Sequence, residues 1–346
     1  MHNPLQVLKH YWGYDGFRPG QAEVIDSILS GHDTLALMPT GGGKSITFQV
    51  PALANPGICL VVSPLVALMK DQVKNLQKRG ILSAFISSEM PHWEILQQLD
   101  NCILGDYKFL YISPERISSE LFQEKLKTLS RKVNLLVVDE AHCISQWGND
   151  FRRDYRLIAD IRDVIPHVQV IAVTASATAA VVADICEQLH FRKGYRIFKT
   201  SFERKNLSFV VRKTDNKLKE ICHILSAVPG SAVIYSRTRK GVEEYAGKLR
   251  AAGISAEYFH AGLDPVLKTE RQADWVKGFT RVLVATNAFG MGIDKGDVRV
   301  VIHTEFPDSM EAYYQEAGRA GRDGKRAYAV ALLGPQDITD IKRRPS

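Results

Sequence analysis

The chain has 346 residues, which is long for a single hydrophobic core and predicts two domains. Hydrophobic residues make up 45% and charged residues 24% of the chain, and this ordinary globular composition excludes disordered and collagen-like proteins. The formal net charge of +7 favours a polyanionic partner.

Cysteine spacing and apolar segments indicate the cellular compartment in which the protein resides. The five cysteines lie far apart and form no C-x-x-C pair, so we expect reduced thiols and neither a disulfide framework nor a zinc site in this chain. The first 13 residues lack the apolar core of a secretion signal, and the longest apolar stretch, 58–69, is interrupted by Ser63-Pro64. The sequence therefore predicts a cytoplasmic protein without a membrane span.

The first half of the chain alternates apolar runs with helical segments. Amphipathic helices are predicted over 5–12 and 22–29, and Gly13 is expected to end the first. The strands expected in this half are 34–37, 58–63, 83–86, 109–113, 134–138 and 169–174. Continuous apolar strands separated by helices indicate a parallel sheet covered on both faces.

A polar, basic stretch at 200–206 separates this half from a second alternating series, and we place the domain boundary there, giving domains 1–203 and 204–346. The strands expected after it are 207–211, 232–235, 256–259, 281–285, 298–303 and 327–332. The sequence therefore predicts two similar α/β domains, the second of them without a phosphate-binding loop.

A glycine-rich stretch follows the first expected strand and precedes a helical segment. It reads Met38-Pro39-Thr40-Gly41-Gly42-Gly43-Lys44-Ser45. A strand, a glycine turn and a helix bring backbone N–H groups and the positive end of the helix dipole together, which suits a polyphosphate. Lys44 would reach the β- and γ-phosphates, and the Ser45 hydroxyl would bind Mg²⁺. Met38 departs from the G-x-x-x-x-G-K-[ST] pattern, but the alternative of a plain connecting turn explains neither Lys44-Ser45 nor the strand.

Gln21 precedes this loop by about twenty residues, between a turn at 14–20 and a helical run. Its amide offers a donor and an acceptor together, which can pair with N6 and N7 of adenine. The alternative is a solvated glutamine after a turn. With the phosphate loop nearby, adenine recognition is the preferred interpretation.

Two adjacent acids, Asp139 and Glu140, end the apolar run at 135–138. Open α/β folds bind ligands at the carboxyl ends of their strands. Asp139 would hold Mg²⁺, and Glu140 would orient and deprotonate the attacking water. The alternative of two solvent-facing acids is weakened by Lys44 and Ser45 upstream.

Arg319 and Arg322 lie near the end of the second half, within the stretch 314–324. We expect them at the start of a helix, where a spacing of three places them on one face. An arginine from a separate domain is suited to stabilise charge on the γ-phosphate in the transition state. The alternative is a surface pair. If the catalytic interpretation holds, ATP lies in a cleft between the domains, and hydrolysis produces domain motion.

These stretches together resemble the motifs of superfamily-two helicases, over residues 40–45, 139–142, 174–178 and 315–322. Three more narrow the resemblance to the RecQ family of DNA helicases: FRPGQ at 17–21, CISQWG at 143–148 and AFGMGIDK at 288–295. The similarity runs from about residue 8 to residue 324.

The resemblance implies two tandem RecA-like domains, each a mostly parallel sheet covered by helices on both faces. It also implies an ATP- and Mg²⁺-dependent 3′–5′ DNA helicase of repair and recombination. Such an enzyme would act as a monomeric core on single-stranded and forked DNA, at the nucleoid in a bacterium or in the nucleus of a eukaryote. The nucleotide-binding residues would be Arg18, Gln21, Thr40, Gly41, Gly42, Gly43, Lys44 and Ser45.

The family's strand track implies a set of DNA-binding residues across the tops of both sheets. They are Ser63, Pro64, Arg116, Gln146, Trp147, Phe151, Arg152, Arg237, His260 and Thr286. Small hydroxyl residues at sheet edges can bind phosphate without reading bases, although each alone is more typical of a helix cap than of a DNA contact.

Residues 146–155 match the aromatic-rich loop that links DNA binding to ATP hydrolysis in the family. Trp147 and Phe151 offer stacking faces for bases, and Arg152 adds phosphate attraction or a cation–π contact. The alternative is two aromatics packed in the core. The sequence departs from the family at Asn149, usually His, and at Arg153, usually Pro.

The family generally continues past the arginine motif into a four-cysteine zinc-binding module and a winged helix, whereas this chain has no cysteine after Cys222. We expect either a piece of a longer protein or a naturally short form. The alternatives to a DNA helicase are a nucleotide-gated DNA-binding ATPase with little or no unwinding, an RNA-directed helicase and, least favoured, a small-molecule kinase.

Overall fold

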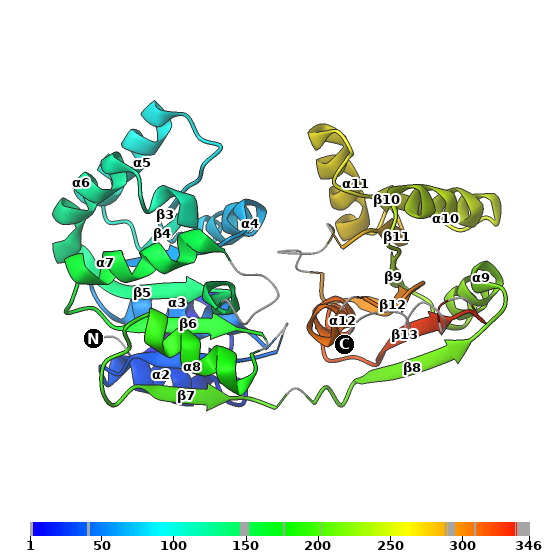
Figure 1. Cartoon of the computed structure of the whole chain (residues 1–346), viewed down its shortest axis with the longest axis horizontal. Coiled ribbons are helices and arrows are strands. Elements are labelled where there is room, and N and C mark those ends of the chain that lie inside the picture. Colours follow the sequence, from blue (N-terminus) through cyan, green and yellow to red (C-terminus); the bar gives the residue numbers. More distant parts are fainter. Residues whose placement is uncertain are drawn as a thin grey trace. The chain divides into compact units, whose positions relative to one another are not determined.

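The computed structural model describes residues 3–39, 42–145, 152–175, 177–201, 203–287, 289, 295–307, 309–335 and 337. The chain divides into two compact units, Met1–Phe202 and Glu203–Ser346 (Figure 1). Each unit is a parallel sheet with helices on both faces, as predicted. No helix in the described ranges is both long and apolar enough to cross a membrane.

Unit 1 contains a seven-stranded sheet in the order β3-β4-β2-β5-β6-β1-β7, with every paired strand parallel. Its strands are β1 Thr34–Leu37, β2 Ile58–Val62, β3 Ser83–Ile86, β4 Phe109–Ile112, β5 Val133–Asp139, β6 Val170–Thr174 and β7 Arg196–Lys199. Six of them confirm the expected strands. β7 was not expected, because this edge strand is largely exposed and lacks an apolar run.

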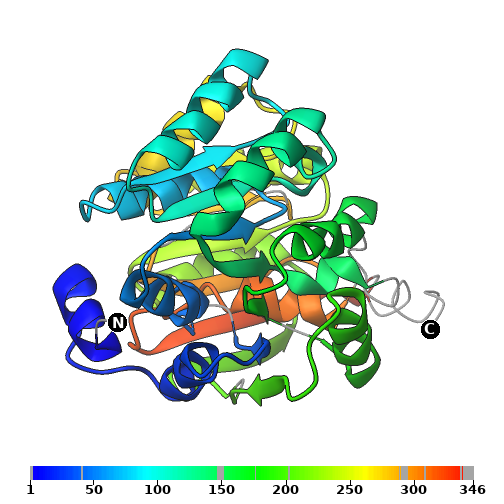
Figure 2. The same ribbon diagram turned by 90° about the vertical axis from the view of Figure 1, so that its left-hand side faces the viewer.

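Two apolar layers cover the sheet of unit 1. Successive side chains of a strand point to opposite faces, so Leu60 packs in one layer while Cys59 and Val61 pack in the other. On one side lie α1 Pro4–Trp12, α2 Gln21–Leu29, α3 Lys44–Ala54 and α4 Val66–Gln77. On the other lie α5 His92–Leu104, α6 Glu120–Leu129, α7 Ile158–Val164 and α8 Ala179–Gln188; Figure 2 shows blue and green helices on opposite sides.

Short 3-10 segments connect some of these elements: η1 Pro114–Arg116, η2 Ser130–Lys132, η3 Ala141–Ile144 and η4 Arg153–Leu157. The predicted end of the first helix at Gly13 is confirmed. Gly13 adopts a left-handed conformation with φ of 72°, which glycine reaches without steric cost, and its N–H closes the helix on the Lys9 carbonyl.

Unit 2 contains a six-stranded parallel sheet in the order β10-β11-β9-β12-β13-β8. Its elements are β8 Leu207–Lys213, α9 Lys217–Ala227, β9 Ser231–Tyr235, α10 Arg239–Ala251, β10 Ala256–Phe259, α11 Pro265–Lys277, β11 Val282–Ala285, β12 Val298–His303, α12 Met310–Ala317 and β13 Ala327–Leu333. All six expected strands of this half are confirmed.

The core of unit 2 also has two layers. Helices α9 and α10 pack on one face of its sheet, and α11 and α12 pack on the other. Among the residues that the structure describes, Trp275 of α11 is the largest fully buried side chain, and its indole N–H donates to the carbonyl of Ala232 at 3.1 Å. Burying one aliphatic side chain of such a layer contributes about 1.5–3 kcal/mol.

Candidate functional site

The glycine-rich loop of unit 1 connects β1 to α3, as predicted. Helix α3 begins at Lys44, and Gly43 precedes it with φ of 78° and no side-chain cap. A Cβ on Gly43 would lie 2.4 Å from Nε2 of Gln21, so this position needs glycine for its space as well as its φ. The uncapped N–H groups of the first turn suit an anion. Ser45 is the second residue of α3, and Thr40 and Gly41 lie outside the described residues.

Lys44 and Glu140 form an ion pair, with Nζ 3.0 Å from Oε1 and side chains only 15% and 21% exposed. Glu140 directly follows β5 and has a left-handed backbone with φ of 47°, rare for a residue with a Cβ. The other carboxylate oxygen of Glu140 lies 3.5 Å from Nδ1 of His142. Lys44, the predicted phosphate ligand, thus neutralises Glu140, the predicted general base. Bound phosphates would attract Lys44 and break this ion pair.

Asp139 is the last residue of β5, and three other groups fix its position. Its carboxylate accepts from the Glu140 N–H at 3.0 Å and from the Ser63 hydroxyl at 3.4 Å. Its backbone carbonyl accepts from the Tyr155 hydroxyl at 2.9 Å. Burial raises the pKa of Asp139 to about 6, the charge of Glu140 adds to the shift, and Lys44 opposes it. Two adjacent, half-buried carboxylates suit a divalent cation, and the donor set Ser45 and Asp139 fits Mg²⁺.

A pH experiment tests the environment of Asp139. Its pKa is about 6 in the folded protein against 3.8 as a reference, so between these values the folded chain holds a proton that the unfolded chain lacks. The wild type therefore gains stability from Asp139 as the pH falls from about 7 to about 4. Asp139→Asn removes this titration. We expect the variant to have the higher Tm at pH 8 without metal, and the difference to shrink towards pH 5. A difference that is constant over this range would contradict the interpretation.

Gln21 is 3% exposed and both ends of its amide have partners in unit 1. Its Oε1 accepts from the backbone N–H of Arg18 at 2.9 Å, and its Nε2 donates to the carbonyls of Gly42 and Gly43 at 3.2 and 3.1 Å. The amide is thus directed at the phosphate loop. Adenine recognition by Gln21 stays a prediction, and it requires these bonds to be exchanged for bonds to the base.

The predicted DNA-binding residues of unit 1 lie at the ends of neighbouring strands β2 and β4. Ser63 and Pro64 follow β2 and are buried, and Nη1 of Arg152 donates to the Pro64 carbonyl at 3.1 Å. The guanidinium of Arg116 donates to the carbonyls of residues 87, 88 and 90, so it shapes the loop beside β4. Gln146, Trp147 and Phe151 lie outside the described residues.

Ser63 joins two predicted sites, because its hydroxyl contacts the carboxylate of Asp139. The carboxyl end of this sheet thus has predicted DNA-binding residues at β4 and β2 and predicted nucleotide-binding residues at β5 and β1. Sequence reasoning gave no role to Tyr155, although it closes the aromatic-rich stretch. Its hydrogen bond to the Asp139 carbonyl shows that Tyr155 helps to hold the end of β5 in place.

Unit 2 repeats this arrangement. Arg237, His260 and Thr286 follow β9, β10 and β11, which are adjacent in the sheet. The Arg237 N–H donates to Glu305 at 3.3 Å, and Nε2 of His260 lies 2.9 Å from a carboxylate oxygen of Glu243. The fold therefore brings the three predicted DNA-binding residues of this unit to one sheet edge.

The expectation that Arg319 and Arg322 begin a helix was wrong. Helix α12 ends at Ala317, and both arginines lie in the turns that follow it. The cause is local. Gly318 is the C-cap of α12, and Gly321 has a left-handed backbone with φ of 62° that a helix over residues 319–322 could not include. Both side chains are half-buried. Burial raises the pKa of the Tyr235 hydroxyl to about 12, which the nearby Arg319 opposes.

Comparisons with known proteins agree with this geometry. A family model of DEAD/DEAH box helicases matches residues 18–185, and one of the helicase conserved C-terminal domain matches residues 216–324. The chain is 43% identical to ATP-dependent DNA helicase RecQ of Bacillus subtilis over 98% of its length and 57% of that protein. It is 40% identical to the probable ATP-dependent DNA helicase RecS of the same organism, over 96% of its length and 67% of that protein.

A solved structure of helicase Lhr from Mycobacterium smegmatis bound to ssDNA and AMP-PNP has the same fold, with a TM-score of 0.76 at 21% identity, over 98% of this chain and 49% of that one. The chain spans about half the length of the RecQ relatives it matches, 57%, 54% and 52% in three bacteria.

Proposed function

Because the chain belongs to the RecQ family of ATP-dependent DNA helicases, we propose that it hydrolyses ATP with Mg²⁺ and moves 3′ to 5′ along single-stranded DNA. Residues 1–203 are the nucleotide-binding domain, and residues 204–346 are the second helicase domain. The observation that carries the proposal is the chain of contacts from Lys44 through Glu140 and Asp139 to Ser63.

Each predicted site residue has a separate role in ATP hydrolysis. The uncapped start of α3 and Lys44 bind the phosphates, and Arg18 and Gln21 hold the base. Ser45 and Asp139 would hold a Mg²⁺ ion, which would neutralise charge on the phosphates. Glu140, once Lys44 has turned to the phosphates, accepts a proton from the attacking water. Arg319 and Arg322 of unit 2 stabilise the charge that develops on the γ-phosphate.

Ser63 supports coupling between DNA and the nucleotide. Its hydroxyl contacts Asp139, and its neighbour Pro64 accepts a hydrogen bond from Arg152, which lies within the aromatic-rich loop. A DNA strand that displaces Ser63 would therefore act on Asp139, the proposed Mg²⁺ ligand, through the Ser63 side chain alone. On this proposal the substrate is single-stranded or forked DNA, bound through phosphates and not through base edges.

The proposal is tested by measuring ATP turnover alone, with single-stranded DNA and with RNA of equal length and sequence. We expect strong stimulation by DNA only. Stimulation by RNA to the same extent would favour an RNA-directed helicase, and no stimulation by either would contradict the proposal.

Unwinding needs a separate assay, because a nucleotide-gated clamp would also show DNA-stimulated hydrolysis. We expect release of a labelled strand from a duplex with a 3′ tail, and none from one with a 5′ tail. Binding and hydrolysis without release from either duplex would favour the clamp.

A further inference from the structure

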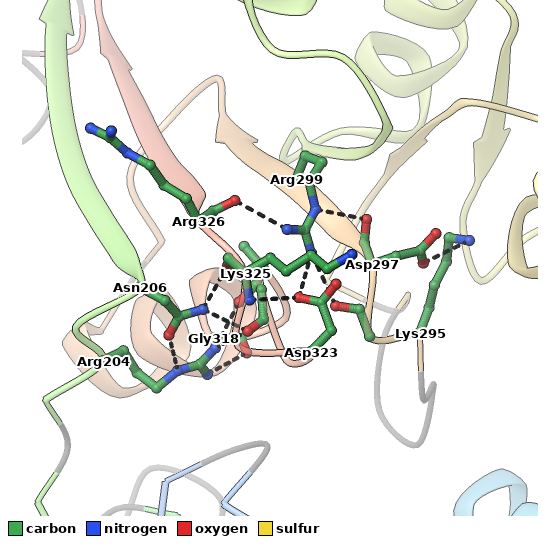
Figure 3. Close-up of polar contacts among 12 residues, drawn as sticks. Arg204, Asn206, Lys295, Asp297, Arg299, Gly318, Asp323, Lys325 and Arg326 are labelled. Carbon is green, nitrogen blue, oxygen red and sulfur yellow. Dashed lines mark hydrogen bonds and ion pairs between the residues drawn. The ribbon is translucent and has the colours of Figure 1, made fainter.

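The segment that enters unit 2 holds the turn that carries the arginine motif (Figure 3). The guanidinium of Arg204 donates to three backbone carbonyls of that turn: Ala320 at 3.0 Å, Gly321 at 2.7 Å and Gly318 at 3.4 Å. These carbonyls flank Arg319 and immediately precede Arg322. One side chain, more than 110 residues away in sequence, therefore fixes the backbone from which both arginines project.

Asn206 reinforces this contact from the same segment. Its amide donates to the carbonyls of Gly321 and Lys325 at 2.7 and 2.8 Å, and its Oδ1 accepts from Nε of Arg204 at 3.3 Å. A Cβ on Gly321 would lie 2.6 Å from the Asn206 amide nitrogen, so the glycine allows this approach. The two side chains form one unit, which we call the 204–206 clamp.

A second brace holds the far end of the same turn. Arg299 pairs with Asp323 at 2.7 Å and donates to the Arg326 carbonyl at 3.1 Å (Figure 3). The Asp323 N–H in turn donates to the carbonyl of Gly296 at 3.1 Å. The arginine motif thus lies in a loop fastened at both ends, which is the arrangement expected where side-chain placement must be accurate.

We propose that Arg204 is a positioning residue for Arg319 and Arg322. This inference rests on the proposed role of the two arginines in ATP hydrolysis. The planar guanidinium fork is needed, because its bonds leave three separate nitrogens, Nε to Asn206, Nη1 to Gly318 and Nη2 to Ala320 and Gly321. A lysine ammonium keeps the charge, but all its donors leave one nitrogen.

The experiment compares Arg204→Lys with a matched control. Arg281 is also an arginine of unit 2 that donates to three carbonyls, those of Gly230, Leu225 and Val228, but these lie at the amino end of the sheet. Both variants lose a similar set of bonds. We expect Arg204→Lys to lower kcat for DNA-stimulated hydrolysis by about tenfold to a hundredfold per folded molecule, with KM for ATP within about twofold. Arg281→Lys should lower Tm alone.

A double-mutant comparison separates positioning from a general loss of structure. In the background Arg319→Ala/Arg322→Ala, Arg204→Lys should lower kcat by less than about twofold, because it acts only through the side chains already removed. Asn206→Ala, a milder change, should show the same dependence with a smaller loss. Equal losses of kcat in both backgrounds, or in Arg204→Lys and Arg281→Lys, would overturn the inference.

The outcome is distinct from a failure of the proposed function. If Arg319→Ala/Arg322→Ala leaves DNA-stimulated turnover unchanged, the arginine motif is not catalytic and the proposed function fails first. If that variant is impaired while Arg204→Lys turns over ATP like the wild type, only the positioning role is wrong.

Discussion

Lys44→Ala is expected to reduce ATP turnover about a thousandfold or more while the protein stays folded. The ammonium group is the cation placed at the start of α3, and its present partner is the predicted general base 3.0 Å away. Its removal eliminates a phosphate ligand and also leaves Glu140 and Asp139 without a charge that opposes their repulsion. Nucleotide affinity and turnover should therefore fall together.

The measurement is steady-state hydrolysis with saturating single-stranded DNA, together with circular dichroism to establish that the variant is folded. Lys125→Ala is the matched control, because Lys125 also forms a lysine–carboxylate pair in unit 1, 2.6 Å from Asp100, between α6 and α5. It should turn over ATP at the wild-type rate. DNA-stimulated hydrolysis that persists in Lys44→Ala would remove the loop from the site.

Arg322→Ala is expected to lower kcat by about a thousandfold and to change DNA affinity little. An arginine that meets the γ-phosphate only as charge develops there contributes to the transition state more than to binding. Arg319→Ala should also lower kcat and change DNA affinity little. Single-turnover hydrolysis measures the chemical step, and fluorescence anisotropy with labelled DNA measures affinity.

Arg326→Ala is the control for this series. Its side chain is exposed and stacks over Tyr328, while the contact that matters to the turn uses its backbone carbonyl, which the substitution leaves in place. It should hydrolyse ATP normally. A kcat for Arg322→Ala within a few-fold of that of Arg326→Ala would contradict a catalytic arginine.

The fold was largely predictable because parallel strands buried on both faces are continuous apolar runs. Strand β7 was not predicted, because it is an exposed edge strand and has no continuous apolar run. The error at Arg319 was avoidable from local signals, because Gly318 and Gly321 both mark the end of a helix. Asp139 and Glu140 were placed correctly at a strand end because that rule depends on topology alone.

The parts that could not be predicted are contacts between distant segments. Gln21 lies against Gly42 and Gly43, and Arg204 lies against Gly321, more than 110 residues away. No periodicity or spacing encodes which carbonyl a polar side chain will meet. A polar stretch such as 200–206 reads as a linker for the same reason, although it contains the 204–206 clamp.

The burial of Trp275 gives the protein a built-in optical probe. It is one of four tryptophans, and the other three, Trp12, Trp93 and Trp147, belong to the first unit. Its indole is shielded from water and hydrogen-bonded to the backbone of β9, so its emission should be blue-shifted while the second unit is folded and should move to longer wavelength when that unit unfolds. With phenylalanine at the other three positions, fluorescence during denaturation reports the melting of one unit, and circular dichroism reports both. The two signals together measure whether the two units unfold as one cooperative body or in two steps.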